Sequence, residues 1–233
     1  MRHDPDAIML FAAGFGTRMK ELTRTRPKPL IEVAGRSLLD RALDLADAAR
    51  IPRRVVNAHY LANQIVAHLN GGSAQVTVET PEILDTGGGL RAALPLLGAG
   101  PVFTLNTDAV WTGPNPLAAL RAAWDPARMD ALLLLVPAGR AHGHSGAGDF
   151  TLDPDGRIAR GPGYVYSGAQ ILDPDGLATI AETVFSLNRL WDRIGAEGRL
   201  YGVVHRGGWC DVGRPEGIAE AEAMLADPPE LLA

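Results

Sequence analysis

The stretch Leu10-Phe-Ala-Ala-Gly-Phe-Gly-Thr-Arg18 joins an apolar strand, Ile8 to Ala13, to a loop that contains two glycines. Glycine tolerates positive φ and close approach to its backbone, so the N–H groups of Gly14 and Gly16 can face phosphate oxygens. Arg18 adds a cation, and Lys28 adds a second one from the proline-flanked segment Arg26-Pro-Lys-Pro-Leu30. This combination predicts a strand and a loop that grip a polyphosphate.

Outward from this stretch, β-branched apolar runs alternate with helical patterns of ten or so residues. Such alternation predicts an α/β, Rossmann-like fold: a mostly parallel sheet with helices on both faces and ligands at the carboxyl ends of the strands. The expected strands are Ile8 to Ala13, Arg54 to Ala58, Gln75 to Glu79, Val102 to Asn106 and Ala131 to Val136. The expected helices are Leu38 to Arg50, Leu61 to Leu69, Gly89 to Leu97 and Pro116 to Trp124.

After about Pro137 the pattern changes to β segments separated by Asp-Pro-Asp-Gly and Gly-Pro-Gly turns. They are Phe150 to Asp153, Arg157 to Ala159 and Tyr164 to Leu172, and a helix follows over Glu216 to Leu225. We expect one domain over residues 1–226, with a nucleotide-binding half (1–137) and a second half (138–226) that packs on the sheet and builds a second pocket. Residues 227–233 are expected to form a frayed tail.

The charge balance excludes some partners. The chain has 233 residues, 46% of them hydrophobic, and a formal net charge of -5. A global basic field for nucleic acid or an anionic membrane is therefore absent, and phosphate binding must come from local cations. A single cysteine, Cys210, fits a reducing cytoplasm and is expected to pack in the core. A monomer or a homodimer is expected.

Two carboxylates follow later apolar runs. Asn106 and Asp108 end the strand Val102 to Asn106, so they lie at the ligand-bearing edge of the sheet, where a divalent cation needs hard oxygen ligands. Asp211 lies in Gly208-Trp-Cys-Asp-Val-Gly-Arg214, at a junction between a strand and a helix. Each of these aspartates could instead cap a turn or a helix.

A dinucleotide-binding oxidoreductase is a weaker alternative, because Met19 stands where the third glycine of G-x-G-x-x-G is required. The pair His142 and His144 would suit a transition metal, but no third ligand stands nearby in the sequence, and we expect a mobile loop over the pocket.

Ala12 to Arg18 and Pro27 to Leu30 resemble the opening motif, roughly AAGxGTR followed by PKP, of the sugar-1-phosphate nucleotidyltransferase family. Trp209 to Gly213 is similar to a W-x-D-x-G element of that family, and Leu84 to Gly88 is similar to the L-x-T-G-G loop of its uridylyl-transferring branch. Thr107 departs from the N-G-D form of the family. Over nearly the full length the chain most resembles the N-acetylmuramate 1-phosphate uridylyltransferases of cell-wall recycling.

The resemblance implies a nucleotide-diphospho-sugar transferase fold and a reaction in which UTP and a sugar 1-phosphate give a UDP-sugar and pyrophosphate. It implies Mg²⁺ held by Asp108 and Asp211, and a catalytic role for Arg18, Lys28 and Asp108. The residues expected to bind the nucleotide are Ala12, Ala13, Gly14, Gly16, Thr17, Arg18, Lys28, Asn57, Thr86, Gly87, Gly88 and Asn106. Asp149, Ser167 and Gly168 are expected at the sugar.

Three alternatives stay open at this point. The same chemistry could serve mannose 1-phosphate with GTP, or glucose 1-phosphate with dTTP or UTP. A non-catalytic regulatory module could have kept the fold, although Arg18, Lys28, Asp108 and Asp211 together argue against it. His59 is as well suited to a structural hydrogen bond as to the nucleotide.

Overall fold

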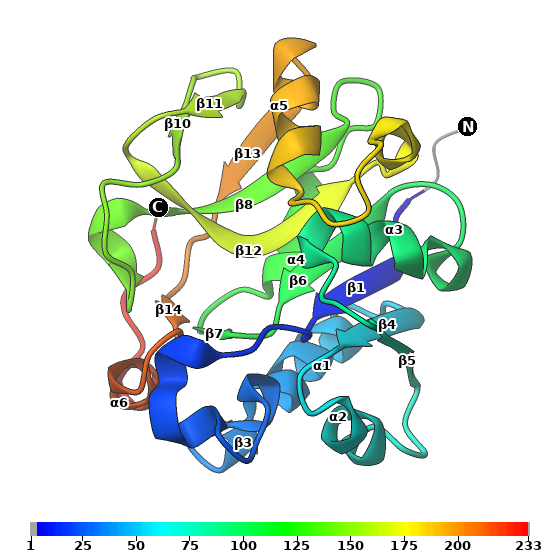
Figure 1. Cartoon of the computed structure of the whole chain (residues 1–233). Coiled ribbons are helices and arrows are strands. Elements are labelled where there is room, and N and C mark those ends of the chain that lie inside the picture. Colours follow the sequence, from blue (N-terminus) through cyan, green and yellow to red (C-terminus); the bar gives the residue numbers. More distant parts are fainter. Residues whose placement is uncertain (1–3, 233) are drawn as a thin grey trace.

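The first half of the chain builds four parallel strands in a nine-stranded sheet (Figure 1). The structure is a computed structural model and describes residues 4–232. In the order β6-β1-β4-β5, the parallel strands are β6 (Val102–Asn106), β1 (Ala7–Phe11), β4 (Arg53–Ala58) and β5 (Ala74–Val78). Phe11, the last residue of β1, pairs with Asn57 on one side and with Asn106 on the other. The register therefore brings the polar ends of β4 and β6 to one edge of the sheet.

The second half extends this sheet instead of packing on it. The long strand β12 (Tyr164–Leu172) pairs antiparallel with β6 on one side and with β8 (Ala131–Pro137) on the other, and β13 (Leu200–Val204) runs parallel to β8. A hairpin of β10 (Phe150–Leu152) and β11 (Ile158–Arg160) continues from the start of β12. Its place at the start of β12 brings residues of the second half to the ligand edge.

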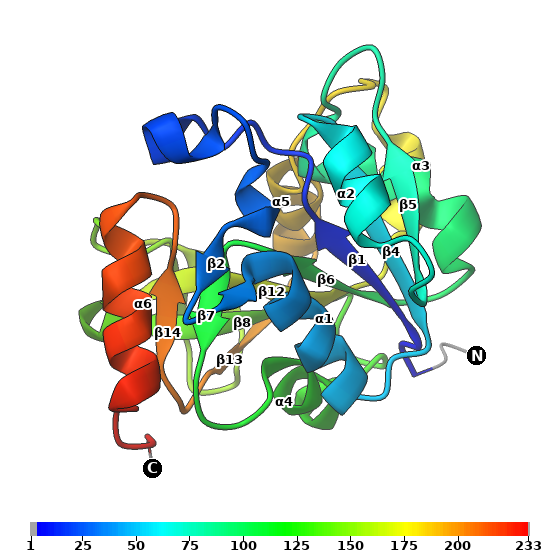
Figure 2. The ribbon, with the colours of Figure 1, turned by 90° about the horizontal axis from the view of Figure 1, so that it is seen from below.

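Helices cover both faces of the sheet, as expected. The buried side chains of β1 alternate, so Ile8 and Leu10 pack with one set of helices and Met9 with the other. The first set is α1 (Leu38–Ala48), α2 (Ala62–His68) and α4 (Pro116–Ala123), and the second is α3 (Asp85–Leu97) and α5 (Asn188–Ala196). Figure 2 shows α6 (Glu216–Ala226) apart from both sets, beside β14.

A second, small sheet joins distant segments of the chain. Its three strands are β7 (Ala109–Trp111), β14 (Trp209–Asp211) and β9 (Ala141–His142), with β14 in the middle. A hairpin of β2 (Glu32–Val33) and β3 (Arg36–Ser37) precedes α1. Short 3₁₀ turns cover η1 (Thr17–Thr23), η2 (Lys28–Leu30), η3 (Ala138–Arg140) and η4 (Asp175–Thr179).

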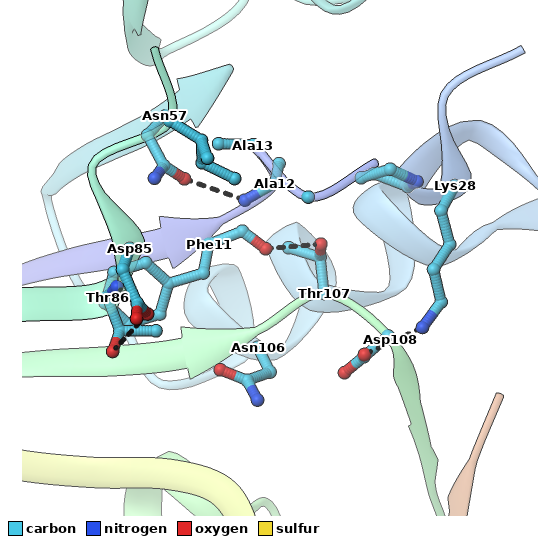
Figure 3. Close-up of a pocket in the computed structure, with 13 residues that line it drawn as sticks. Phe11, Ala12, Ala13, Lys28, Asn57, Asp85, Thr86, Asn106, Thr107 and Asp108 are labelled. Carbon is cyan, nitrogen blue, oxygen red and sulfur yellow. Dashed lines mark hydrogen bonds and ion pairs between the residues drawn. The ribbon is translucent and has the colours of Figure 1, made fainter. Parts of the chain in front are cut away.

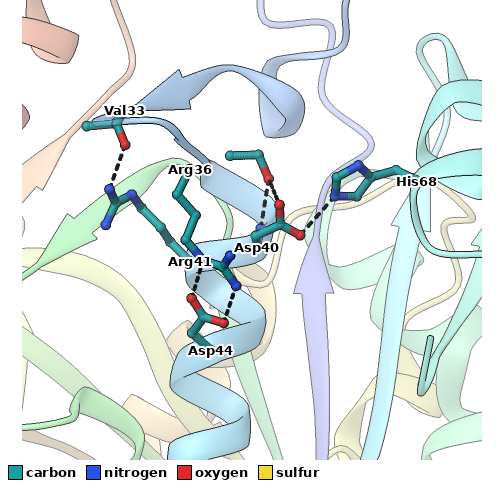
Figure 4. A network of polar contacts seen from close by, with 7 residues as sticks. Val33, Arg36, Asp40, Arg41, Asp44 and His68 are labelled. Carbon is teal, nitrogen blue, oxygen red and sulfur yellow. Dashed lines mark hydrogen bonds and ion pairs between the residues drawn. The ribbon is translucent and has the colours of Figure 1, made fainter.

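Polar contacts fix the start of α1 (Figure 4). The hydroxyl of Ser37 accepts a hydrogen bond from the N–H of Asp40 at 3.0 Å, which caps the helix. Asp40 also contacts Nε2 of His68, the last residue of α2, at 2.8 Å. Burial alone would raise the pKa of Asp40, but the hydrogen bonds with Ser37 and His68 outweigh it and lower that pKa. The cap thus also ties α1 to α2.

One expected boundary needs correction. Helix α3 begins at Asp85 and not at Gly89, so Gly87 and Gly88 lie inside its first turn rather than before it. Helix α5 and strand β13 were not expected from the sequence. In the described part of the tail, the N–H of Leu232 donates to the carbonyl of Arg206 at 2.8 Å, and fraying of the tail stays a prediction. Among residues 4–232, none of the helices has the length and apolar character that crossing a bilayer requires.

Candidate active site

A cavity of about 250 Å³ opens at the carboxyl ends of β1, β4 and β6 (Figure 3). We call it the first cavity. It brings together residues of both sequence motifs and of the strand ends. Its lining consists of Phe11, Ala12, Ala13, Gly14, Lys28, Pro29, Asn57, Ile83, Asp85, Thr86, Asn106, Thr107 and Asp108. Eight of the expected site residues therefore share one hollow: Ala12, Ala13, Gly14, Lys28, Asn57, Thr86, Asn106 and Asp108.

Asn57 holds the backbone that leaves β1. Its Oδ1 accepts a hydrogen bond from the N–H of Ala12 at 2.8 Å, and its Nδ2 donates to Oε1 of Glu79 at 2.7 Å. Glu79 is a buried carboxylate whose other oxygen accepts from the N–H of Leu84 at 2.7 Å. His59 contacts the carbonyl of Glu79 at 2.9 Å, a structural hydrogen bond. One network thus connects the glycine loop with the segment that leads into α3.

The two glycines of the opening motif have different surroundings. Gly16 has φ +64°, and a Cβ there would lie 2.9 Å from Cβ of Lys28 and 2.9 Å from Cγ2 of Thr23. Gly14 lines the first cavity, does not have positive φ, and would place a Cβ with nothing within 4 Å. Gly16 therefore packs the loop against Lys28, whereas Gly14 keeps the cavity open.

Lys28 and Asp108 form an ion pair on the floor of the cavity. Nζ of Lys28 lies 2.8 Å from Oδ2 of Asp108, and the lysine side chain is only 11% exposed. Thr107, the departure from the family pattern, is buried and donates its hydroxyl to the carbonyl of Phe11 at 2.7 Å. It therefore ties the end of β6 to the end of β1, so this departure strengthens the edge that carries Asp108.

The small sheet places Asp211 beside Asp108. Strand β14 pairs Asp211 with Ala109, and the N–H of Val212 donates to the carbonyl of Asp108 at 2.7 Å. Burial raises the pKa of Asp211, and the negative charge of Asp108 raises it further. Two neighbouring carboxylates that repel each other suit a hard divalent cation, so the residues present fit Mg²⁺.

Arg18 lies near Asp211 and outside the lining of the first cavity. A Cβ on Gly213 would be 2.7 Å from Oδ2 of Asp211 and 3.0 Å from Nη2 of Arg18, so both groups face this glycine. The lining of the adjoining groove is Arg18, Lys20, His142, Gly143, His144, Ser145, Asp211, Arg214, Pro215, Glu216, Gly217 and Glu220. The next residues of the opening motif therefore do not line the first cavity, although Gly14 does. They are Gly16, Thr17 and Arg18.

Gly87 and Gly88 serve the protein's own packing. Their N–H groups donate to the carbonyl of Phe185 at 2.9 and 3.1 Å. A Cβ on Gly87 would lie 2.3 Å from the ring of Phe185, and one on Gly88 would lie 2.4 Å from the carbonyl oxygen of Thr183. The room that these glycines leave is filled by residues 183–185, and Thr86 faces the first cavity instead. Their contact with a base stays a prediction without support from this geometry.

A second cavity, of about 340 Å³, adjoins the first and shares with it Phe11, Asp85, Thr86 and Asn106. Its other lining residues are Asp149, Phe150, Arg160, Tyr166, Ser186, Leu187, Asn188 and Trp191. Of the three residues expected at the sugar, Asp149 alone lines it. The hydroxyl of Ser167 is buried and donates to the carbonyl of Leu134 at 2.6 Å, so this side chain is committed to the fold.

Gly168 has a packing role as well. It has φ +89°, and a Cβ there would lie 2.8 Å from Cβ of Asn106. Ser167 and Gly168 therefore have packing partners in β8 and in Asn106, and their contact with a sugar stays a prediction. The register of β12 against β8 shifts between Tyr166 and Gln170, which is where these two residues lie.

Sequence reasoning missed several residues in and behind these cavities. Glu79, which bonds to Asn57 behind the first cavity, was read only as a strand end, although a buried carboxylate usually has fixed partners. Tyr166 and Trp191 lie in edge contact, with ring centroids 4.8 Å apart, in the wall of the second cavity. No signal in the sequence marked Trp191, because its helix was not recognised.

Two features set aside in the sequence analysis, the motif of His142 and His144 and the single Cys210, gain no role in the site from the structure. Within residues 4–232, no group of three or more His, Cys, Asp or Glu side chains is arranged to hold a metal ion, so the two-histidine motif gains no third ligand. Cys210 is buried, as expected, and burial raises the pKa of its thiol to about 12. It is therefore not an activated nucleophile.

Comparison with known proteins identifies the family, because the model of the MobA-like NTP transferase domain matches residues 8–160. The chain belongs to this family. It is 42% identical to an N-acetylmuramate alpha-1-phosphate uridylyltransferase of Caulobacter vibrioides, over 97% of this chain and 100% of the relative. It is 36% identical to the enzyme of the same name from Neisseria meningitidis serogroup B, over 93% of this chain and 96% of that relative.

The fold is shared with distant relatives as well. The crystal structure of HddC from Yersinia pseudotuberculosis complexed with GMP-PN superposes with a TM-score of 0.75 at 21% identity, over 97% of this chain and all of that one. The expected fold class is thus confirmed, and so is the expected class of enzyme, a sugar-1-phosphate nucleotidyltransferase. This membership excludes the dinucleotide-binding oxidoreductase.

Proposed function

We propose that the protein transfers a uridylyl group from UTP to N-acetylmuramate 1-phosphate in cell-wall recycling, giving UDP-N-acetylmuramate and pyrophosphate. The observation that carries the proposal is that two cavities meet at Asn106, beside the Lys28–Asp108 pair. Two substrates bound in them would have their phosphates next to one lysine. The similarity to two uridylyltransferases of that name over nearly the whole chain supports the choice of base and sugar.

In this reaction an oxygen of the sugar phosphate attacks the α-phosphorus of UTP, and the bond between the α- and β-phosphates breaks. Both reactants are anions, so the enzyme's task is to position them and to offset their charge. Lys28, held in place by Gly16 and Asp108, supplies one fixed cation in the lining of the first cavity. Arg18 supplies a second cation for the phosphates that leave.

Asp108 and Asp211 would hold Mg²⁺, which supplies further positive charge to the phosphates when bound. Their proximity through the small sheet supports this assignment. Asn57 has a positioning role in this scheme, because both ends of its amide are bonded to the protein and fix the loop at Ala12.

The substrates are tested by pairing each of the four ribonucleoside triphosphates and dTTP with the 1-phosphates of N-acetylmuramate, N-acetylglucosamine, glucose and mannose. Release of pyrophosphate is followed, and we expect the highest kcat/KM for UTP with N-acetylmuramate 1-phosphate. Equal or faster turnover with GTP and mannose 1-phosphate, or with dTTP and glucose 1-phosphate, would refute the proposal. Asp155→Asn, a substitution in an exposed turn, is the control variant, and we expect it to show the same substrate preference as the wild-type enzyme.

A further inference from the structure

The second cavity contains one cationic side chain among its described lining residues, Arg160. Arg160 is the last residue of β11 and reaches α5 in the other wall of the cavity. Two carboxylates, Asp85 and Asp149, line the same cavity. A ligand with a negative charge away from its phosphate would therefore be repelled from most of this cavity and attracted to one place in it.

The guanidinium of Arg160 is held in a fixed plane. Its Nη2 donates to Oδ1 of Asn188 at 2.8 Å and to Oδ1 of Asp192 at 3.1 Å, and its Nε donates to the same aspartate at 3.3 Å. The group also stacks over Phe150 at 4.8 Å and over Trp191 at 5.6 Å from the ring centroids. Such contacts orient an arginine before any ligand binds, which reduces the entropy that binding costs.

One edge of this guanidinium remains for a ligand. The hydrogen bonds above use Nε and Nη2, and Nη1 donates to no other residue of the described chain. The ion pair with Asp192 does not neutralise the group fully, because the two side chains are 46% and 64% exposed and water screens them. Arg160 thus keeps unpaired N–H donors and part of its charge at the cavity wall.

We propose that Arg160 binds the lactyl carboxylate of N-acetylmuramate and so selects this sugar over N-acetylglucosamine. The inference rests on the proposed function, and it names the residue that would read the group by which the two sugars differ. A guanidinium with free N–H groups is the side chain best suited to a carboxylate. Asp85 and Asp149 strengthen the selection, because they disfavour any other placement of that charge.

The test compares Arg160→Met with the wild-type enzyme on the 1-phosphates of N-acetylmuramate and N-acetylglucosamine, each with UTP. Methionine keeps an unbranched stem between Phe150 and Trp191 but removes the donors and the charge. A charge-assisted hydrogen bond contributes a factor of about 10 to 100 in affinity. We therefore expect kcat/KM for the muramate substrate to fall by about 10- to 100-fold, mainly through KM, and the preference between the sugars to shrink by about the same factor.

Arg157→Met is the matched control, because it removes an arginine next to β11 that pairs with Asp155 and does not line the second cavity. We expect it to keep the preference. An equal loss on both sugars in Arg160→Met, or the same loss of preference in Arg157→Met, would make Arg160 a purely structural residue and overturn the inference.

The two proposals fail in different ways. If the wild-type enzyme does not use N-acetylmuramate 1-phosphate with UTP, the proposed function is wrong and the inference falls with it. If the wild-type enzyme prefers that sugar and Arg160→Met prefers it to the same extent, only the assignment of Arg160 is wrong.

Discussion

Lys28 owes its position to uncharged neighbours as well as to an ion pair. Prolines on either side restrict its backbone, and Gly16 leaves just enough room for its Cβ. A buried lysine needs a partner, and Asp108 provides one at 2.8 Å. The Lys28 cation is therefore fixed both by backbone geometry and by the ion pair.

The Gly14→Ala substitution is expected to change nucleotide binding with little effect on the stability of the fold. A Cβ at Gly14 meets no protein atom within 4 Å, so we expect stability to change by less than about 1 kcal/mol. The added methyl group would project toward the cavity, so we expect KM for UTP to rise about tenfold or more. Steady-state kinetics at varied UTP measures this change. Gly139→Ala, which also meets nothing within 4 Å, is the control, and an unchanged KM in Gly14→Ala would place the nucleotide elsewhere.

For single residues, the sequence motifs predict which side chains line the first cavity, but they do not predict which residues pack against each glycine in the fold. The motifs Gly14 to Arg18 and Pro27 to Pro29 led directly to Lys28, and the end of β6 led to Asp108. The identity of a glycine, however, does not say what fills the space beside it. Gly168 leaves room for Asn106 and Gly88 for Thr183, and these partners lie far along the chain.

Helix α3 depends on the segment before α5 for its first turn. Its N-terminal N–H groups lack partners within the helix, and the carbonyl of Phe185 accepts from Gly87 and Gly88. Arg91 of α3 stacks over the ring of Phe185 at 4.7 Å. The hydroxyl of Thr86 accepts from the N–H of Leu187 at 3.0 Å. The wall shared by the two cavities is therefore built from two elements that are separate in the sequence.

Gly88→Ala tests this dependence. Its Cβ would lie 2.4 Å from the carbonyl oxygen of Thr183, which is backbone and has little freedom to move. Overpacking of this kind lowers the free energy of unfolding by about 1–3 kcal/mol. Urea denaturation measures the loss, and we expect both substrate KM values to rise because the shared wall shifts. Wild-type stability in Gly88→Ala would contradict the packing described.

Among the elements, the parallel strands were predictable and the small sheet was not. Strands β1, β4, β5 and β6 are apolar runs bounded by helical patterns. The expected bounds of β6 match the observed ones, and those of the other three differ by one or two residues. Strands β7, β14 and β9 are only two or three residues long, and they pair across large separations in the chain. Local patterns hold no information about such pairing.

The whole molecule brings one carboxylate from each half of the chain to the same place. Asp108 follows β6 of the main sheet. Asp211 is the last residue of β14, which is the middle strand of the small sheet and pairs with β7 and β9. Neither half alone has both carboxylates. Binding of a nucleotide with Mg²⁺ at this junction should therefore stabilise the fold as a unit, since it draws on both halves.

Thermal unfolding with UTP and Mg²⁺ tests this coupling. A ligand at about one hundred times its Kd adds about 2.7 kcal/mol, and 1 kcal/mol raises Tm by about 2–4 °C in a chain of this size. We expect UTP with Mg²⁺ to raise Tm by about 5–11 °C, and UTP with a chelator to raise it less. Asp108→Asn and Asp211→Asn should each lose the Mg²⁺-dependent part, because each removes a ligand of the cation, whereas Asp155→Asn should keep it. A full Mg²⁺-dependent rise in both site variants would show that the cation binds without these two carboxylates.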